Sequence, residues 1–348
     1  MLRVTGSEVA AVVLRARLNQ LCQGRGGAHA RFGARDAEFG SVTVRWAVVS
    51  VDIVIATPLF LDLTIVGLEA LPALGEERFA GDLLRSPGGG AITAVAAARL
   101  GLRTAAVAPL GDDIAGEFVR DQLESEGVTV AGPRTARTPQ TLVMPFGDDR
   151  AMVTIDPGAR SRAADVVALQ PRAVAANLEQ IDLVPDGTRG YITCGDDDAR
   201  AFARRLPPAI SRTRAFFLDR SDALVLTGEN TLEDAVAMLA QSVETVVAMD
   251  GAHGMLTMLG GHRVPAPDFE TGPAVDTTGD RDLISAAFAW ADLGGADAAT
   301  ALAWACLYSQ LAMTVPTATG GAVTEERLLQ EGTARGLVPP PRADRAPV

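Results

Sequence analysis

Short β-branched and apolar runs alternate with alanine-rich segments along most of the chain. The run Val51–Ala56 is almost wholly apolar and predicts a buried parallel strand. Apolar and polar residues alternate at 61–68, 77–84, 140–146 and 150–155, which predicts half-exposed strands of a second, smaller sheet. This succession of elements is typical of a layered α/β fold, with a mostly parallel central sheet flanked by helices.

The remaining apolar segments complete this layered pattern. An alanine-rich segment directly after three glycines predicts a helix at Ala91–Leu100. Two later segments, Asp282–Leu293 and Ala298–Met313, are apolar on all sides and predict buried helices. Further strands are predicted at 104–109, 215–218, 223–226 and 245–249.

The two ends of the chain differ in composition from the middle. Residues 1–45 hold seven arginines and three acidic residues, and glycines interrupt any long amphipathic helix there. We interpret 1–45 as an unstructured extension that reflects a misassigned start codon, with a mitochondrial-type targeting peptide as the alternative. Residues 46–332 are the predicted domain, with the strands of the smaller sheet near 61–84 and 140–155, and residues 333–348 are a tail rich in proline and arginine.

Composition and charge exclude several classes of protein. With 48% apolar residues, 21% charged residues and a net charge of −12, the chain is typical of a globular protein. The acidic balance, without any basic run, argues against a nucleic-acid partner. The longest apolar stretch, Trp46–Leu61, contains Asp52 and Pro58 and predicts no membrane span. We therefore expect a small-molecule partner.

The chain contains no lysine, so all 31 of its Lys and Arg residues are arginines. P-loop NTPases, Schiff-base enzymes and eukaryote-type kinases depend on a lysine and are excluded. Cys22, Cys194 and Cys306 are scattered, which favours reduced thiols and a cytoplasmic location. The three histidines lack metal-ligand spacing, so no zinc site is predicted.

Three segments carry candidate chemistry. Ser86–Gly90 is a glycine-rich turn into a helix, where backbone can approach a ligand, although a plain loop-to-helix turn explains it equally. Gly111–Glu117 precedes a helix that ends near Gly127, which indicates helix capping. Val275–Asp282 places backbone N–H groups at a helix start, where they stabilise an anion, and sets Asp282 as a proton acceptor beside them.

In this order and spacing, the three segments resemble the ribokinase-like (PfkB) family of carbohydrate kinases. Leu100-Gly101, Gly111-Asp112-Asp113 with Gly116, and Gly127-Val128 are similar to the N-terminal signature of that family. Asp276-Thr277-Thr278-Gly279 with Asp282 is similar to its C-terminal signature. The resemblance covers roughly Val51–Gly332. It implies a ribokinase-like fold with a small β-sheet lid, ATP and Mg²⁺ as cofactors, room for a monovalent cation, and a homodimer formed through the lid.

The resemblance also assigns roles by position. Asp282 would be the catalytic base, and the backbone of Gly279, Asp280 and Arg281 would form the anion hole. Asp62, placed at the end of the first strand, would bind substrate hydroxyls together with Gly88, Gly89 and Thr93. The nucleotide would lie near Thr277, Thr278, Gly251, Gly254 and Gly321. Glu229 would stand in for the acidic residue of the family's magnesium motif.

The expected activity is ATP-dependent phosphoryl transfer to a hydroxyl of a sugar, nucleoside or small polyol. The loop before Asp282 departs from the family's pattern and leaves two interpretations open. The family's usual loop is Gly-Ala-Gly-Asp, whereas this chain has charged side chains at Asp280 and Arg281. Arg281 can clamp a phosphate with two N–H groups. Alternatively, the chain is a non-catalytic family member that binds sugar or nucleotide in a regulatory role.

Overall fold

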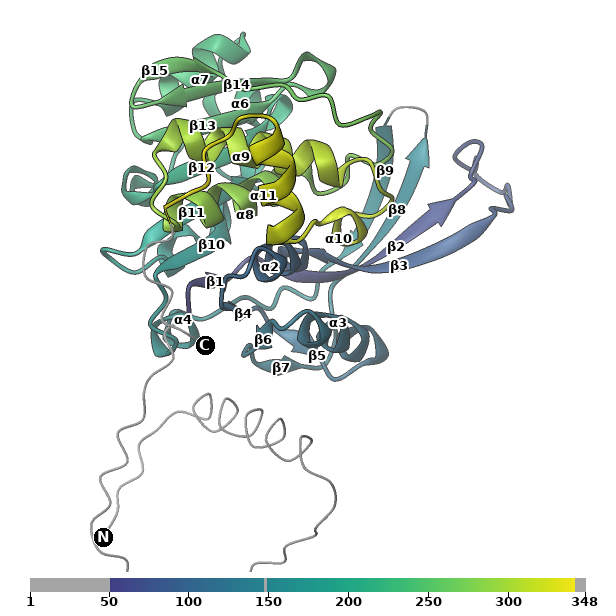
Figure 1. The fold of residues 1–348 in the computed structure, drawn as a ribbon. Helices are drawn as coiled ribbons and strands as arrows, with labels where there is room; N and C mark the ends of the chain where they lie inside the picture. The colour runs from purple at the N-terminus through teal and green to yellow at the C-terminus, as the bar shows by residue number, and fades with distance from the viewer. Residues whose placement is uncertain (1–50, 147–148, 342–348) are drawn as a thin grey trace, which may run out of the picture. The chain divides into compact units, whose positions relative to one another are not determined.

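The computed structural model describes residues 51–146 and 149–341, which lie within one compact unit, Val51–Val348. The predicted extension 1–45 lies outside the described residues. The centre of the unit is a nine-stranded sheet with the order β15-β14-β13-β12-β11-β10-β1-β4-β6 (Figure 1). Its strands are β1 (Ile53–Ile55), β4 (Thr104–Ala106), β6 (Thr129–Val130), β10 (Ala173–Asn177), β11 (Arg189–Cys194), β12 (Ala215–Asp219), β13 (Thr245–Met249), β14 (Met255–Leu259) and β15 (His262–Pro265).

The strands β6, β4, β1, β10, β11, β12 and β13 run parallel to one another. Strand β14 pairs antiparallel with both β13 and β15. From β1 the chain first adds strands on one side and later adds β10 to β13 on the other. In open parallel sheets, ligands bind beyond the carboxyl ends of the strands near such a reversal of strand order. The topology therefore directs the search for a site to that edge.

Helices flank the central sheet on both faces. One face is packed by α2 (Gly90–Arg99), α8 (Asp280–Leu293) and α9 (Ala298–Ala312), whose small and apolar residues form the main core with alternate residues of the strands. Tyr191 and Phe217 meet Phe288 of α8 edge to face within this core. The other helices of the described residues are α3 (Ile114–Ser125), α4 (Ala163–Ala168), α5 (Asp196–Ala201), α6 (Arg220–Thr227), α7 (Leu232–Leu239), α10 (Ala318–Gly321) and α11 (Glu325–Ala334), with 3₁₀ segments at Leu178–Leu183, Pro208–Arg212 and Gly251–His253.

A second sheet of four strands, which we call the lid, extends from the helix-covered body (Figure 1). Its order is β3-β2-β8-β9, formed by β2 (Leu59–Val66), β3 (Asp82–Gly89), β8 (Gln140–Phe146) and β9 (Asp149–Ile155). Asp62 lies in the middle of β2, and not at the end of the first strand as predicted. The third sheet is a single pair, β5 (Leu110–Gly111) with β7 (Arg134–Thr135).

The segment Gly111–Glu117 serves the fold, in line with its capping pattern. Asp113 accepts a hydrogen bond of 2.8 Å from the backbone N–H of Gly116 and so caps α3. The same carboxylate accepts hydrogen bonds from the backbone N–H and the hydroxyl of Thr138, just before β8. This motif therefore fixes α3 to the base of the lid.

Several predicted elements differ from the structure. The predicted strand 223–226 lies inside helix α6, where Ala223 and Leu226 are buried while Val225 is exposed, and Gly228 ends the helix with a positive φ of 75°. A run of four apolar residues suits either element, and packing decided for the helix. Strands β10, β11, β14 and β15 were not predicted. The predicted tail begins inside α11, and the indole N–H of Trp304 donates to the carbonyl of Val338, which ties the tail to α9 at that point.

Within the described part of the chain, every helix is too short or too polar to cross a membrane.

Candidate active site

The glycine run between β3 and α2 is imposed by the close approach of strand β2. A Cβ on Gly88 would lie 2.0 Å from Oδ2 of Asp62, and a Cβ on Gly89 would lie 2.6 Å from the carbonyl oxygen of Pro58. Gly89 also has a positive φ of 56°, which favours glycine. The side chain of Asp62 therefore lies directly against the backbone of Gly88, beside the start of α2.

The face of the lid that carries Asp62 is rich in hydroxyl groups. Asp62 pairs with Ser86 on β3 and with Thr141 on β8, and Thr141 pairs with Thr154 on β9. The Thr141 and Thr154 hydroxyl oxygens are 3.1 Å apart. Residues directly opposite each other in a sheet share a face. The lid thus presents one carboxylate among several hydroxyls on this face.

The loop before α8 is held tightly between α2 and α10. Gly279 has a φ of 77°, and a Cβ there would lie 2.8 Å from both Ile92 of α2 and Ala318 of α10. Asp276 accepts hydrogen bonds from the backbone N–H groups of Thr278 (2.8 Å) and Thr317 (2.9 Å). Among the described residues, no side chain caps the N-terminus of α8. The N–H of Asp280 makes only a long hydrogen bond of 3.4 Å to the carbonyl oxygen of Thr277, so this helix start can still receive an anion.

Asp282 and Thr93 meet where α8 crosses α2. The Thr93 hydroxyl, which is buried, donates a hydrogen bond of 3.3 Å to Oδ1 of Asp282. Burial raises the pKa of Asp282 from 3.8 to about 6, opposed by Arg281 and the Thr93 hydrogen bond and reinforced by the carboxylates of Asp219 and Asp280. With a pKa of about 6, Asp282 is mostly ionised at neutral pH and still accepts a proton readily.

The two charged residues before Asp282 turn in different directions. The Ser309 hydroxyl of α9 donates a hydrogen bond to Oδ1 of Asp280, which draws this carboxylate toward α9. Nη1 of Arg281 donates to the carbonyl oxygen of Cys194 at 2.5 Å, to Asp219 at 3.2 Å and to Asp222 at 3.1 Å. The guanidinium therefore lies at the carboxyl ends of β11 and β12.

Asp219 and Asp222 were not predicted as site residues. Asp219 is the last residue of β12, and Asp222 lies in the first turn of α6, so both reach the carboxyl edge of the sheet. Burial raises the pKa of Asp222 to about 6, against the attraction of Arg281. The sequence signal for this pair was a second aspartate, Asp222, three residues after the aspartate that directly follows a predicted strand. It was missed because 223–226 was predicted as a further strand and not as a helix.

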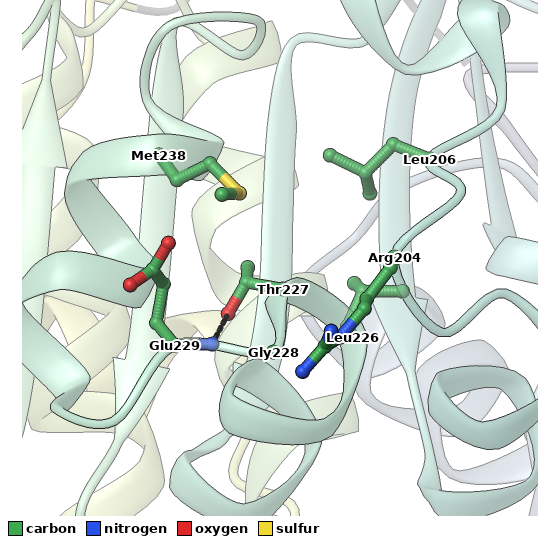
Figure 2. A pocket seen from close by; sticks show the side chains of 7 residues that line it. All are labelled: Arg204, Leu206, Leu226, Thr227, Gly228, Glu229 and Met238. Atoms are coloured by element: carbon green, nitrogen blue, oxygen red, sulfur yellow. Dashed lines mark hydrogen bonds between the residues drawn. The ribbon is translucent and has the colours of Figure 1, made fainter.

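Glu229 is not brought to this site. It follows the C-terminal end of α6, whereas Asp219 precedes the start of that helix, and eight helical residues span about 12 Å. Glu229 instead lines a separate cavity of about 350 Å³ (Figure 2). The cavity is lined by Arg204, Leu206, Leu226, Thr227, Gly228, Glu229 and Met238.

The glycines predicted to contact the nucleotide fall into two groups. Gly251 and Gly254 belong to the turn after β13, with φ of 55° and 83°, and a Cβ at either position would meet nothing within 4 Å. This turn is open to a ligand. A Cβ on Gly321, in contrast, would lie 2.1 Å from the carbonyl oxygen of Ala312, so packing of α10 on α9 is enough to require this glycine.

The described residues give little support for a preformed metal site. They contain no group of three or more His, Cys, Asp or Glu side chains arranged to hold a metal ion. Asp219 and Asp222 both form ion pairs with Arg281, the second residue of α8. This pair does not fit a divalent ion while the guanidinium is there.

The layered sheet, the lid and the carboxylate at the start of α8 define a protein of the ribokinase fold. The ribokinase of Arabidopsis thaliana, solved in complex with ribose and ATP, has a TM-score of 0.69 and 21% identity to this chain, covering 81% of it and 98% of the Arabidopsis chain. The chain belongs to the pfkB family of carbohydrate kinases, whose model matches residues 72–325. The predicted fold class and family are thereby confirmed.

Two curated relatives support the same family. The ribokinase of Bacillus subtilis (strain 168) is 29% identical over 276 residues, which are 74% of this chain and 91% of that protein. The acarbose 7(IV)-phosphotransferase of Actinoplanes sp. is 26% identical over 258 residues, which are 66% of this chain and 81% of that protein. Similarity of this kind assigns a family, whereas the substrate depends on the individual site.

Proposed function

We propose that this protein transfers a phosphoryl group from ATP to a hydroxyl of a sugar, nucleoside or related polyol. The observation that carries the proposal is the position of Asp282: it lies at the uncapped start of α8 and accepts a hydrogen bond from Thr93. The relatives support the choice of donor and acceptor, since they include ribokinases and an acarbose phosphotransferase.

Asp282 would act as the general base. Its carboxylate takes the proton of the acceptor hydroxyl as the oxygen attacks the transferred phosphorus, a role typically worth about 10²- to 10⁴-fold in rate. The backbone N–H groups at Gly279, Asp280 and Arg281 would stabilise the charge that develops on the phosphoryl oxygens. The Asp280 side chain does not oppose this, because Ser309 holds it toward α9.

Asp62, Gly88, Gly89 and Thr93 would bind the acceptor. The two glycines lack a Cβ that would fill the space beside Asp62, so a polyhydroxy ligand can approach the carboxylate. The hydroxyl groups of Ser86, Thr141 and Thr154 on the same lid face are suited to further hydrogen bonds with such a ligand. Ile92 is only 4% exposed and packs against Gly279, so it supplies no polar contact to an acceptor.

Thr277, Thr278 and the open turn of Gly251 and Gly254 would contact the nucleotide. All four lie in loops beyond the carboxyl ends of the strands, on the same edge as Asp282. Gly321 supports this region by packing α10 against α9. Any Mg²⁺ would arrive with the ATP phosphates, and we assign it no ligand in the chain, because Glu229 lies elsewhere and Asp219–Asp222 holds Arg281. The monovalent cation remains a prediction.

The first test measures ADP release from Mg-ATP by the purified protein over a panel of sugars, nucleosides and polyols. Asp282→Asn is run in parallel and should reduce acceptor-dependent turnover by about 10²- to 10⁴-fold. The matched control is Asp297→Asn, since Asp297 caps α9 and asparagine caps a helix as well as aspartate. Wild-type turnover in Asp282→Asn would remove Asp282 from the mechanism.

A regulatory binder is the second candidate, and the ion pairs of Arg281 favour it because they bring a large charged side chain beside the anion hole. This alternative predicts no acceptor-dependent ADP release from any compound of the panel. It also predicts that ATP or a sugar still raises the melting temperature, as a ligand that binds only the folded state does.

A further inference from the structure

The three contacts of Arg281 form a set of oxygen ligands around one positive charge. A single nitrogen, Nη1, is within 3.2 Å of carboxylate oxygens of Asp219 and Asp222 and 2.5 Å from the carbonyl oxygen of Cys194. Carboxylate and carbonyl oxygens are also the ligands that Mg²⁺ and Mn²⁺ prefer. The guanidinium therefore stands where a hard cation would find suitable donors.

Burial of one of the two carboxylates favours a cation at this position. The side chain of Asp222 is only 5% exposed and that of Arg281 is 24% exposed, whereas that of Asp219 is 49% exposed. A buried carboxylate beside a second carboxylate is costly to ionise unless a positive charge compensates it. Arginine stays protonated at every accessible pH, so its charge is permanent.

The guanidinium and a metal ion cannot share the site. Mg²⁺ and Mn²⁺ bind their oxygen ligands at about 2.0 to 2.2 Å. The space between the two carboxylates is taken by Nη1 of Arg281. We propose that Arg281 is the resident cation of the Asp219–Asp222 pair and excludes a divalent metal from it. Arg281 is thus a positioning residue that fixes the charge balance beside the start of α8.

The test measures Mn²⁺ binding to the nucleotide-free, full-length protein by electron paramagnetic resonance, in which bound Mn²⁺ loses the sharp signal of the free ion. The wild type should show no site that depends on Asp222. Arg281→Ala should gain one Mn²⁺ site, with an affinity at least tenfold higher than any Mn²⁺ binding by the wild type. The double variant Arg281→Ala with Asp222→Asn should lose that site again.

Two further variants keep the test decisive. Arg281→Met keeps most of the apolar stem but lacks the charge and does not reach the position of Nη1, so it replaces Arg281→Ala if the latter fails to fold. Arg220→Ala is the matched control, because Arg220 pairs with a single carboxylate, Asp250, and its removal should create no Mn²⁺ site.

Two outcomes would overturn the inference: a stoichiometric Mn²⁺ site in the wild type that Asp222→Asn abolishes, or a folded Arg281→Met protein with no gain. The inference rests on the proposed function only for its meaning in catalysis. Since Mn²⁺ binding is measured without ATP or acceptor, a negative kinase assay leaves this result untouched, and the two proposals fail separately.

Discussion

The hydroxyl of Thr93 donates a hydrogen bond of 3.3 Å to the carboxylate of Asp282, although 189 positions separate the two residues in the chain. Thr93 lies in the first turn of α2, directly after the glycines that accommodate Asp62, and Asp282 lies in the first turn of α8. One short helix thus connects the base of the lid to the proposed catalytic carboxylate.

This contact predicts the pH dependence of the reaction. Asp282 works as a base only when ionised, and its pKa is about 6, so kcat/KM should rise with pH below that value and level off above it. Thr93→Val removes a hydrogen bond that favours the charged form, which raises the pKa and moves the midpoint to higher pH. Thr93→Ser should keep the wild-type midpoint. Identical profiles for Thr93→Val and the wild type would show that Thr93 does not tune the base.

Asp282 should also lower the stability of the folded protein at neutral pH. Its folded pKa of about 6 exceeds the ordinary value of 3.8, so the folded state binds the proton more tightly and stability falls as pH rises from about 4 to 6. Asp282→Asn should therefore be more stable than the wild type at pH 8, by about 1 to 3 kcal/mol, and nearly equal near pH 4. Urea unfolding at the two pH values measures this difference. A pH-independent difference would exclude ionisation of Asp282 as its cause.

Gly88 should be required for acceptor binding. A Cβ there would lie 2.0 Å from Oδ2 of Asp62, so Gly88→Ala displaces the carboxylate and should raise KM for the acceptor about tenfold or more, equivalent to about 1.4 kcal/mol. Gly81→Ala is the matched control directly before β3, because its Cβ would meet only the Val66 carbonyl at 3.4 Å. Steady-state kinetics with the identified acceptor measures KM for the two variants and the wild type. Equal KM values for both variants would remove Asp62 from the acceptor site.

The lid face opposite Asp62 should mediate a homodimer. Val153 and Ile155 of β9 are 56% and 58% exposed, and Ile65 and Leu83 share their face. Exposed apolar patches of this kind mark interaction surfaces. Val153→Asp should convert a dimer to a monomer in sedimentation velocity, whereas Val167→Asp, at an equally exposed position on α4, should not. A wild-type protein that sediments as a monomer at micromolar concentration would contradict the prediction.

Much of the fold could be predicted from the sequence because its elements carry local signals. The apolar run before Ala56, the alternation at 61–68, 140–146 and 150–155, and the alanine-rich helices each fit one type of element. The predicted strand 77–84 was displaced, because the strand is Asp82–Gly89. Strand β10 escaped prediction because Ala173–Asn177 is rich in alanine, which disfavours strands, and only its burial between two parallel neighbours holds it extended. The apolar run 223–226 became a helix because α6 packs on α5, α7 and the sheet.

The sequence by itself determined the residues whose chemistry is local: the glycines that turn into α2, the helix start after Gly279, and Asp282 beside it. Only the tertiary structure decided which distant residues join them. The parallel sheet brings the ends of β11 and β12 to one edge, which places Cys194, Asp219 and Asp222 around Arg281. No local pattern specifies that meeting, because strand order and register, and not spacing along the chain, set which side chains become neighbours.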